Sequence, residues 1–416
     1  MTDEVGARPL WAGRSMVLIG IILVAANLRT AVAAFSPIIS SIRDDIPLGS
    51  LEIGVMGMLP PIAFAAAGFA APAVARRLGL ELTIALASLA MVVGPIVRAL
   101  AGEYGVLATG TVIALAGMGF GNILLPPAVK KYFPDRIGTV TSAYATIMSI
   151  GAALPAIAAA PVADAAGWRT SMGLWGVVAT TALLPWVVVW LQSRADARRS
   201  RREGIVPDVP TEFLGRLGHS RVAWAIALAF AVSAFNVYAV FAWLPEILLD
   251  ITGIDAVQAG ALLALFGIMG LPASLIVPAI AQRIRNAGHL VVAGVAAWVL
   301  GYLGLLLAPE TLTWLWVMLV GIGPLAFPLS LALINLRTRS TGASAALSGF
   351  VQSVGYTAGA LGPLIVAVVH DLTRGWTIPL VVLLLSSLIS IVSSVILARP
   401  RFVEDDLAER VARPAR

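Results

Sequence analysis

Long apolar segments recur along almost the whole chain and are separated by short polar intervals. A helix that crosses a bilayer needs roughly 20 apolar residues in a row, and twelve segments meet this length. Glycine and proline interrupt many of them, which membrane helices tolerate better than soluble helices do. The pattern predicts an all-α integral membrane protein with twelve spans, at residues 15–42, 51–75, 80–100, 104–128, 137–162, 170–192, 221–249, 257–281, 288–308, 311–335, 343–369 and 375–398.

The longest polar interval, residues 193–220, follows the sixth segment and divides the spans into two groups of six. The predicted organisation is an N-terminal segment at 1–14, a six-helix bundle at 15–192, a linker at 193–220, a second six-helix bundle at 221–398 and a tail at 399–416. Equal numbers of spans in the two halves raise the question of whether the halves are copies of one unit.

Short motifs repeat in the same order in the two halves, 204 to 208 residues apart. They are Ser149-Ile150-Gly151 with Ser353-Val354-Gly355, Gly167-Trp168 with Gly375-Trp376, Pro37 with Pro245, and Pro72 with Pro278. This predicts two pseudo-symmetric bundles. The plan resembles that of major facilitator transporters, in which two six-helix repeats are related by an axis along the membrane normal and hold substrate near the midplane.

Charge is scarce and unevenly placed. Charged residues make up 12% of the chain, against about 25% in a soluble domain. With a cytoplasmic N-terminus, 23 of the 28 Lys and Arg residues fall on the cytoplasmic side, four fall outside, and Arg29 lies within a span. This asymmetry follows the positive-inside rule. It predicts a multi-pass protein of the cytoplasmic (inner) cell membrane with both termini in the cytoplasm. The net charge of +6 is then a topology signal and does not indicate nucleic-acid binding.

The chain lacks the residues that several classes of chemistry require. The chain has no cysteine, and its three histidines lie far apart without metal-ligand spacing. The glycines of residues 117–121 follow no strand, so a dinucleotide loop is excluded, and no glycine-rich phosphate loop precedes the only lysines, Lys130 and Lys131. We therefore expect no catalytic residues, no cofactor and no metal, and the protein is not expected to be an enzyme.

Arg29 is the most informative residue in a span. It lies about 14 residues into the first segment, roughly 21 Å along a helix axis. An arginine at that depth costs at least about 2.5–3.5 kcal/mol to insert, and no Asp or Glu falls at the same depth. We favour an anion site, because guanidinium binds an oxyanion through two hydrogen bonds. The alternative is a structural arginine bonded to backbone carbonyls of a broken helix.

Other polar and aromatic residues fall on predicted spans and are candidate substrate contacts. Gln352 and Tyr356 lie four residues apart and therefore share one helix face. Hydrogen bonds between helices are the alternative role for such residues. The predicted substrate-binding set is Arg29, Asn122, Tyr144, Tyr238, Trp243, Gln352 and Tyr356.

Several motifs resemble one family within the major facilitator group, the cyanate and 2-nitroimidazole transporters. They are the segment from Gly121-Asn122 through Lys130-Lys131-Tyr132-Phe133-Pro134-Asp135-Arg136-Ile137-Gly138, and Asn27-Leu28-Arg29, Trp243-Leu244-Pro245, Gln352-Ser353-Val354-Gly355-Tyr356 and His370-Asp371. The resemblance implies secondary active or facilitated transport of a small anion or small polar heterocycle by alternating access. The alternative is a broader drug or metabolite efflux transporter. The expected partners are a small-molecule substrate and the lipid bilayer, the expected state is a monomer, and a coupled proton stays open.

The resemblance also implies a gate, with one departure. Major facilitator transporters usually carry Asp-Arg-x-Gly after the second helix, whereas this chain has Ala75-Arg76-Arg77-Leu78-Gly79 and lacks the acid. Arg76 and Arg77 are then expected to bond helix-end carbonyls, Asp135 or a tail carboxylate. Glu246, at the outer end of the seventh span, completes the predicted gating set.

Overall fold

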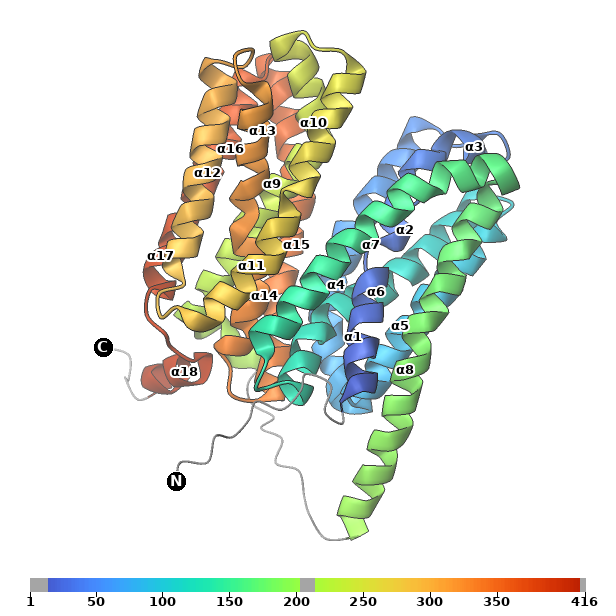
Figure 1. The fold of residues 1–416 in the computed structure, drawn as a ribbon, viewed down its shortest axis with the longest axis vertical. Helices are drawn as coiled ribbons and strands as arrows, with labels where there is room; N and C mark the ends of the chain where they lie inside the picture. The colour runs from blue at the N-terminus through green and yellow to red at the C-terminus, as the bar shows by residue number, and fades with distance from the viewer. Residues whose placement is uncertain (1–13, 203–213, 412–416) are drawn as a thin grey trace, which may run out of the picture.

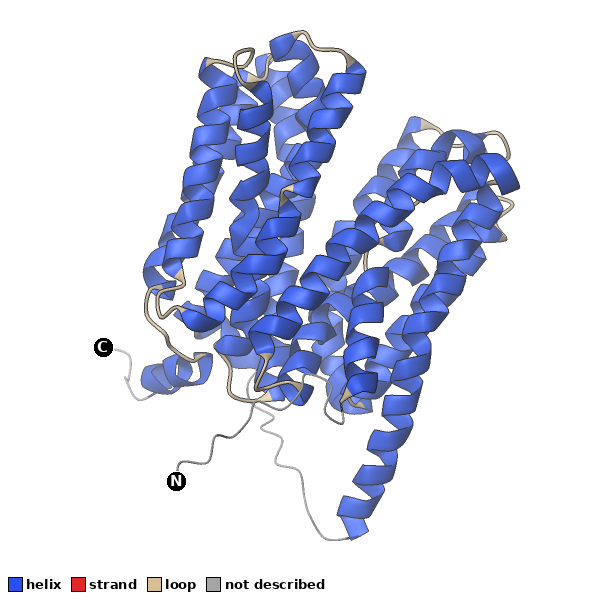
Figure 2. Cartoon of the chain, viewed as in Figure 1, coloured by secondary structure: helices blue, strands red, loops and turns tan. Residues whose placement is uncertain are grey.

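The computed structural model describes residues 14–202 and 214–411, and every regular element in this part of the chain is a helix (Figure 2). Twelve helical segments are long and apolar enough to cross a membrane. The twelve predicted spans are therefore confirmed. Most of the predicted N-terminal segment, the middle of the linker and the end of the tail lie outside the described residues.

The first half of the chain forms one bundle (Figure 1). Its elements are α1 (Ser15–Asn27), α2 (Thr30–Ala33), η1 (Ser36–Ile38), α3 (Ile39–Arg43), α4 (Ser50–Leu78), α5 (Leu80–Ala99), α6 (Tyr104–Tyr132), α7 (Ile137–Ala166) and α8 (Trp168–Arg202). Helix α8 continues ten residues beyond residue 192, where the sequence predicted the linker to begin.

The first span is broken, so its predicted continuity over residues 15–42 was wrong. Helix α1 ends at Asn27, and Arg29 has φ −128° and ψ −6° before α2 begins. The Asn27 side chain donates to the Leu23 carbonyl at 2.8 Å, and the Thr30 hydroxyl donates to the Asn27 carbonyl at 3.0 Å. Polar side chains that bond nearby carbonyls compete with the helical ladder, which accounts for the break at this point.

The second half forms the other bundle. Its elements are η2 (Leu214–His219), α9 (Arg221–Thr252), α10 (Ala256–Ile268), α11 (Gly270–Arg283), α12 (Gly288–Leu307), α13 (Thr313–Ile322), η3 (Gly323–Leu325), α14 (Ala326–Leu336), α15 (Thr341–Thr373), α16 (Thr377–Leu388), α17 (Ser390–Leu397) and α18 (Val403–Val411). Helix α18 occupies the predicted tail, where no helix was expected. Pro324 has a non-helical ψ of 28° and separates α13 from α14.

The two bundles repeat one side-chain contact at equivalent places. The Trp168 indole at the start of α8 donates to Asp45 at 2.9 Å. The Trp376 indole just before α16 donates to Asp250 at 2.7 Å. Each bond joins the last helix of a half to the end of its first span, and each uses the tryptophan of the Gly-Trp motif that repeats in the sequence.

The bundles meet at one end of the molecule and diverge toward the other. One continuous apolar core contains buried residues of both halves. Two further cores belong to a single half each, one around Trp298 and Trp376 and one around Ile38 and Trp168. Figure 1 shows the bundles in contact near α18 and separated at the far end. We refer to these two ends as the α18 end and the opposite end.

The closest approach between the bundles lies between α4 and α15. A Cβ atom on Gly349 would overlap the Pro72 ring and the Gly68 carbonyl, and one on Gly68 would overlap Ser353. Glycine is needed at both positions because it alone lets the two backbones come this near. The contact holds the α18 end of the two halves together.

Candidate functional site

Arg29 lies where the first span breaks, and its side chain reaches the other bundle. Its Nη2 atom donates to the Tyr356 hydroxyl at 3.2 Å, which joins the break between α1 and α2 in the first half to α15 of the second. The residue keeps some accessible surface, while its Nη1 atom is buried and has no hydrogen-bond partner among the described residues. The guanidinium therefore has donor capacity that the protein leaves unused.

Aromatic side chains surround the Arg29–Tyr356 contact. The guanidinium carbon of Arg29 lies 5.1 Å from the centre of the Phe64 ring. Tyr356 packs against Phe64 at 5.1 Å and edge-on against Phe230 at 5.4 Å. Tyr238 lies within electrostatic range of both Arg29 and Tyr356. These rings fix the position of Tyr356 and form an apolar setting in which a charge on Arg29 is poorly screened.

Three further predicted residues, Tyr144, Gln352 and Asn122, belong to the same group. Tyr144, on α7, is buried and lies within electrostatic range of Tyr356. Gln352, one turn nearer the α18 end than Tyr356, donates to the Asn122 carbonyl at 3.1 Å and to Ser348 at 2.9 Å. The side-chain nitrogen of Asn122 (Nδ2) and the side-chain oxygen of Gln352 (Oε1) are buried without partners among the described residues. Gln352 thus serves as a bond between the halves and still offers an acceptor.

Trp243 lies apart from this group. Its indole donates to the Pro363 carbonyl at 2.9 Å, and its ring lies 5.9 Å from Trp376, toward the opposite end of the second bundle. No hydrogen bond or ring contact in the described part of the chain connects it with Arg29 or Tyr356. The structure thus brings six of the seven predicted substrate contacts together and leaves Trp243 as packing within the second half.

No carboxylate of the described residues accompanies Arg29. Among the described residues the guanidinium forms no ion pair, and its one side-chain bond goes to a phenol. Glu246 is exposed near the opposite end of α9, and Asp250 is bound to Trp376. Within the same residues, no three His, Asp or Glu side chains come together as a metal ion would require. The arrangement can hold an anion, or a polar group with an acceptor, between the two bundles.

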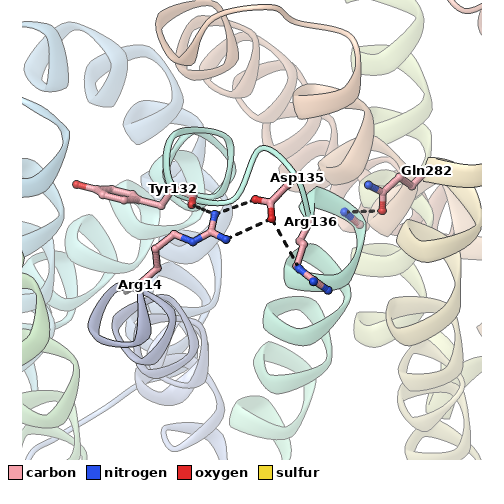
Figure 3. Close-up of polar contacts among 6 residues, drawn as sticks. Arg14, Tyr132, Asp135, Arg136 and Gln282 are labelled. Carbon is pink, nitrogen blue, oxygen red and sulfur yellow. Dashed lines mark hydrogen bonds and ion pairs between the residues drawn. The ribbon is translucent and has the colours of Figure 1, made fainter. Parts of the chain in front are cut away.

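The predicted gating residues do not form the expected contacts. Arg76 and Arg77 are exposed at the end of α4 and form no hydrogen bond or ion pair with any described residue. Asp135 instead accepts two hydrogen bonds from Arg14, at 2.8 and 3.2 Å (Figure 3). These bonds hold the pKa of the Asp135 carboxyl below its usual value. Asp135 therefore ties parts of the first bundle together and does not pair with Arg76 or Arg77.

At the α18 end, the two bundles are joined by hydrogen bonds in which a side chain of one half meets a backbone group of the other. The Lys130 ammonium of α6 donates to the Asn335 carbonyl at 2.8 Å and also to the Thr338 carbonyl, both in the second half. The Gly138 amide donates to Gln282 of α11 at 3.2 Å, beside the Arg14–Asp135 pair (Figure 3). Lys130 and Gln282 are thus two of the polar side chains that join the bundles at this end.

Sequence reasoning missed Phe64, Lys130, Ser348 and Gln282. Phe64 is one apolar residue among many, and nothing in its pattern sets it apart. Ser348 lies one turn before Gln352 on the same helix face and donates to the Ile123 carbonyl at 2.7 Å. Lys130 carries the clearest signal, because the chain has only two lysines and both lie where the fourth span ends.

Comparison with known proteins identifies the family. The sequence profile of the Major Facilitator Superfamily matches residues 17–363, which is most of the chain. The chain belongs to the major facilitator superfamily. It is therefore a multi-pass membrane transporter, and its relatives are transporters and not enzymes.

Two curated relatives are similar over nearly the whole transporter. It is 34% identical to a Bacillus subtilis (strain 168) protein called uncharacterized transporter YycB, over 88% of this chain and 90% of that one. It is 32% identical to the 2-nitroimidazole transporter of Escherichia coli (strain K12), over 91% of this chain and 94% of that one. The resemblance stated from the motifs is therefore confirmed at the level of the family.

Solved structures show the same fold. The proton:xylose symporter XylE, bound to 6-bromo-6-deoxy-D-glucose, superimposes with a TM-score of 0.73, covering 95% of this chain and 98% of that chain. The two sequences are 13% identical. The match confirms two six-helix bundles in the major facilitator arrangement.

Proposed function

We propose that this protein is a secondary active or facilitated transporter of a small anion or a small polar heterocycle, cyanate-like or nitroimidazole-like. The observation that carries the proposal is Arg29, a cation in the middle of the first span with no acidic partner among the described residues. Placing a cation at that depth is costly, and a substrate that supplies the missing acceptor offsets the cost. The similarity to a 2-nitroimidazole transporter supports the same size of substrate.

The proposed binding site lies between the bundles. Arg29 supplies the charge, and Tyr356 and Tyr238 supply hydroxyl groups on the second half. Phe64 limits the size of the site from the first half. Because Arg29 and Tyr356 belong to different halves, a ligand bound there contacts both and can change how they fit together.

We further propose that the α18 end faces the cytoplasm. The excess of Lys and Arg in the loops at that end supports this orientation by the positive-inside rule. The structure is then closed toward the cytoplasm by Lys130 and Gln282 and splayed toward the outside (Figure 1). Transport requires that these bonds break while the opposite ends of the bundles approach each other. One chain contains both halves, so a monomer suffices.

A thermal-shift screen of the purified protein tests the proposal. A ligand that binds only the folded state stabilises it by about 2.7 kcal/mol at a hundred times its dissociation constant. We expect cyanate, other small oxyanions or 2-nitroimidazole to raise the melting temperature, and a bulky lipophilic cation such as tetraphenylphosphonium to leave it unchanged. Stabilisation by the lipophilic cation alone would instead favour the broader efflux function.

A further inference from the structure

A basic cavity lies at the α18 end of the second bundle, away from the site at Arg29. Its volume is about 1070 Å³. Basic side chains from η2, the start of α9 and the segment between α17 and α18 line it: Arg216, His219, Arg221, Arg399 and Arg401. No transport role for this cavity follows from the site described above, because all of its lining residues belong to the second half of the chain.

The acids in the cavity are already engaged. Asp406 accepts hydrogen bonds from the Ser220 hydroxyl at 2.7 Å and the Val222 amide at 3.4 Å. Glu409 pairs with Arg401 at 3.2 Å. The side chains of Arg221 and Arg399 are exposed and have no hydrogen bond or ion pair with any described residue. Among the described residues that line the cavity, the arginines therefore outnumber the acids, and the acids leave Arg221 and Arg399 unpaired.

The cavity lies at the level of the membrane surface. Arg221 begins a candidate span and Leu397 ends another, so Arg399 and Arg401 lie just beyond the apolar segment. Trp224, three residues after Arg221 on α9, is 46% exposed, and its indole donates to the Gly218 carbonyl at 2.8 Å. Tryptophan in such a position is typical of the interface between hydrocarbon and water.

One wall of the cavity is apolar and continues toward the hydrocarbon. Val395 and Ile396 of α17 line the cavity, together with Leu407. Val395 is 70% exposed, and Val392 and Ile391, about one turn farther along α17, are 56% and 44% exposed. A soluble anion needs no such wall, whereas an acyl chain attached to an anionic headgroup does.

We propose that this cavity binds the headgroup of an anionic phospholipid in the leaflet at the α18 end. The phosphodiester lies between Arg221 and Arg399, which supply charge-assisted hydrogen bonds. An acyl chain follows the exposed side of α17. Basic cavities between helices at a membrane surface bind anionic headgroups in this way. The bound lipid joins the start of α9 to the segment that leads into α18.

Binding of defined lipids to the purified full-length protein tests the proposal. We compare dioctanoyl phosphatidylglycerol, the phosphatidylcholine with the same chains, and inorganic phosphate, using native mass spectrometry for affinity and thermal denaturation for stability. The test variant is Arg221→Gln with Arg399→Gln. The matched control is Arg283→Gln with Arg285→Gln, because these two arginines are exposed at the same end but lie outside the cavity.

Phosphatidylglycerol should bind and stabilise the wild-type protein more than phosphatidylcholine does, and phosphate alone should have no effect. Each basic residue near an anionic surface contributes about fivefold to affinity, so the test variant should bind phosphatidylglycerol about thirtyfold more weakly, and the control should not. Equal binding of the two lipids by the wild-type protein would overturn the proposal, whatever the variants do. If phosphate stabilises the protein as much as phosphatidylglycerol does, the cavity binds a soluble anion, and the lipid proposal is overturned.

Discussion

Lys130 offers the sharpest test of how the α18 end is closed. Its ammonium group crosses from α6 to two carbonyls at the end of α14, Asn335 and Thr338. Lys130→Met keeps the length and apolar stem of the side chain and removes both bonds. A hydrogen bond to a charged group contributes about 1.5–3 kcal/mol, and the negative end of the α14 dipole adds a few tenths.

The free energy lost in Lys130→Met should be smaller than the sum of these contributions, because Lys130 is partly exposed and is hydrated again when the α18 end opens. We therefore expect the closed state to lose about 2 kcal/mol relative to the state open at the α18 end, which shifts the ratio of their populations about thirtyfold. Lys130→Arg, which keeps the charge, should shift it much less.

Distances between spin labels measure this shift directly. The chain contains no cysteine, so pairs of cysteines can be introduced without removing any. Labels at Arg77 and Gly342 report on the α18 end, and labels at Asp164 and Asp371 report on the opposite end. Lys130→Met should lengthen the first distance and shorten the second, while Arg283→Gln, an exposed cation at the same end, should change neither. Unchanged distributions in Lys130→Met would show that Lys130 does not hold this end closed.

Three further predictions concern orientation and stability. A single cysteine in place of Asp164 should be labelled by a membrane-impermeant reagent in intact cells, and one in place of Arg283 should not; the reverse pattern would invert the proposed topology. Arg98→Met should slow transport without a large loss of melting temperature. Transport should slow because the change removes the 2.8 Å bond that holds the Ala31 carbonyl just beyond Arg29. The melting temperature should change little because the change also removes a buried cation that has no acidic partner among the described residues. Asp135→Asn should lower the melting temperature at neutral pH. The pKa of Asp135 is lowered in the folded state, so its carboxylate stabilises the fold above the unfolded pKa. The difference in melting temperature between wild type and variant should therefore persist down to about pH 5 and disappear below pH 3.8, as the wild-type carboxyl is protonated.

The spans were predictable because each is set by one dominant physical term, the transfer of about 20 apolar residues into lipid. The break in the first span was not predictable in this way. It depends on the side chains of Asn27 and Thr30 bonding to backbone carbonyls of α1, and the same residues are compatible with an unbroken helix. Helix α18 was missed because it is short and polar and is held by contacts with other segments, including the bond from the Arg339 amide to Glu404 at 2.7 Å.

Members of the candidate site could be predicted where helix periodicity determines which way a side chain points. Gln352 and Tyr356 share a face of α15, and both reach the first half, at Asn122 and Arg29. The gate was not predictable, because each of its bonds pairs one side chain with a backbone group, which every residue possesses: Lys130 donates to carbonyls, and Gln282 accepts from an amide. The missing acid beside Arg76 pointed to a different closure, but only the fold shows that Lys130 provides it.

The central claim is that Arg29 holds the substrate, and the affinity of purified Arg29 variants tests it most directly. Affinity for the ligand found in the thermal-shift screen is measured for the wild type, Arg29→Lys and Arg29→Gln, with melting temperatures on the same samples. Losing a charge contact of this kind costs at least about 2.7 kcal/mol, a hundredfold in affinity. We predict that folded Arg29→Gln protein loses binding by this factor or more, and that Arg29→Lys, which keeps the charge without the planar fork, lies between. Wild-type affinity in folded Arg29→Gln protein would contradict the account and assign recognition to the tyrosines and Gln352.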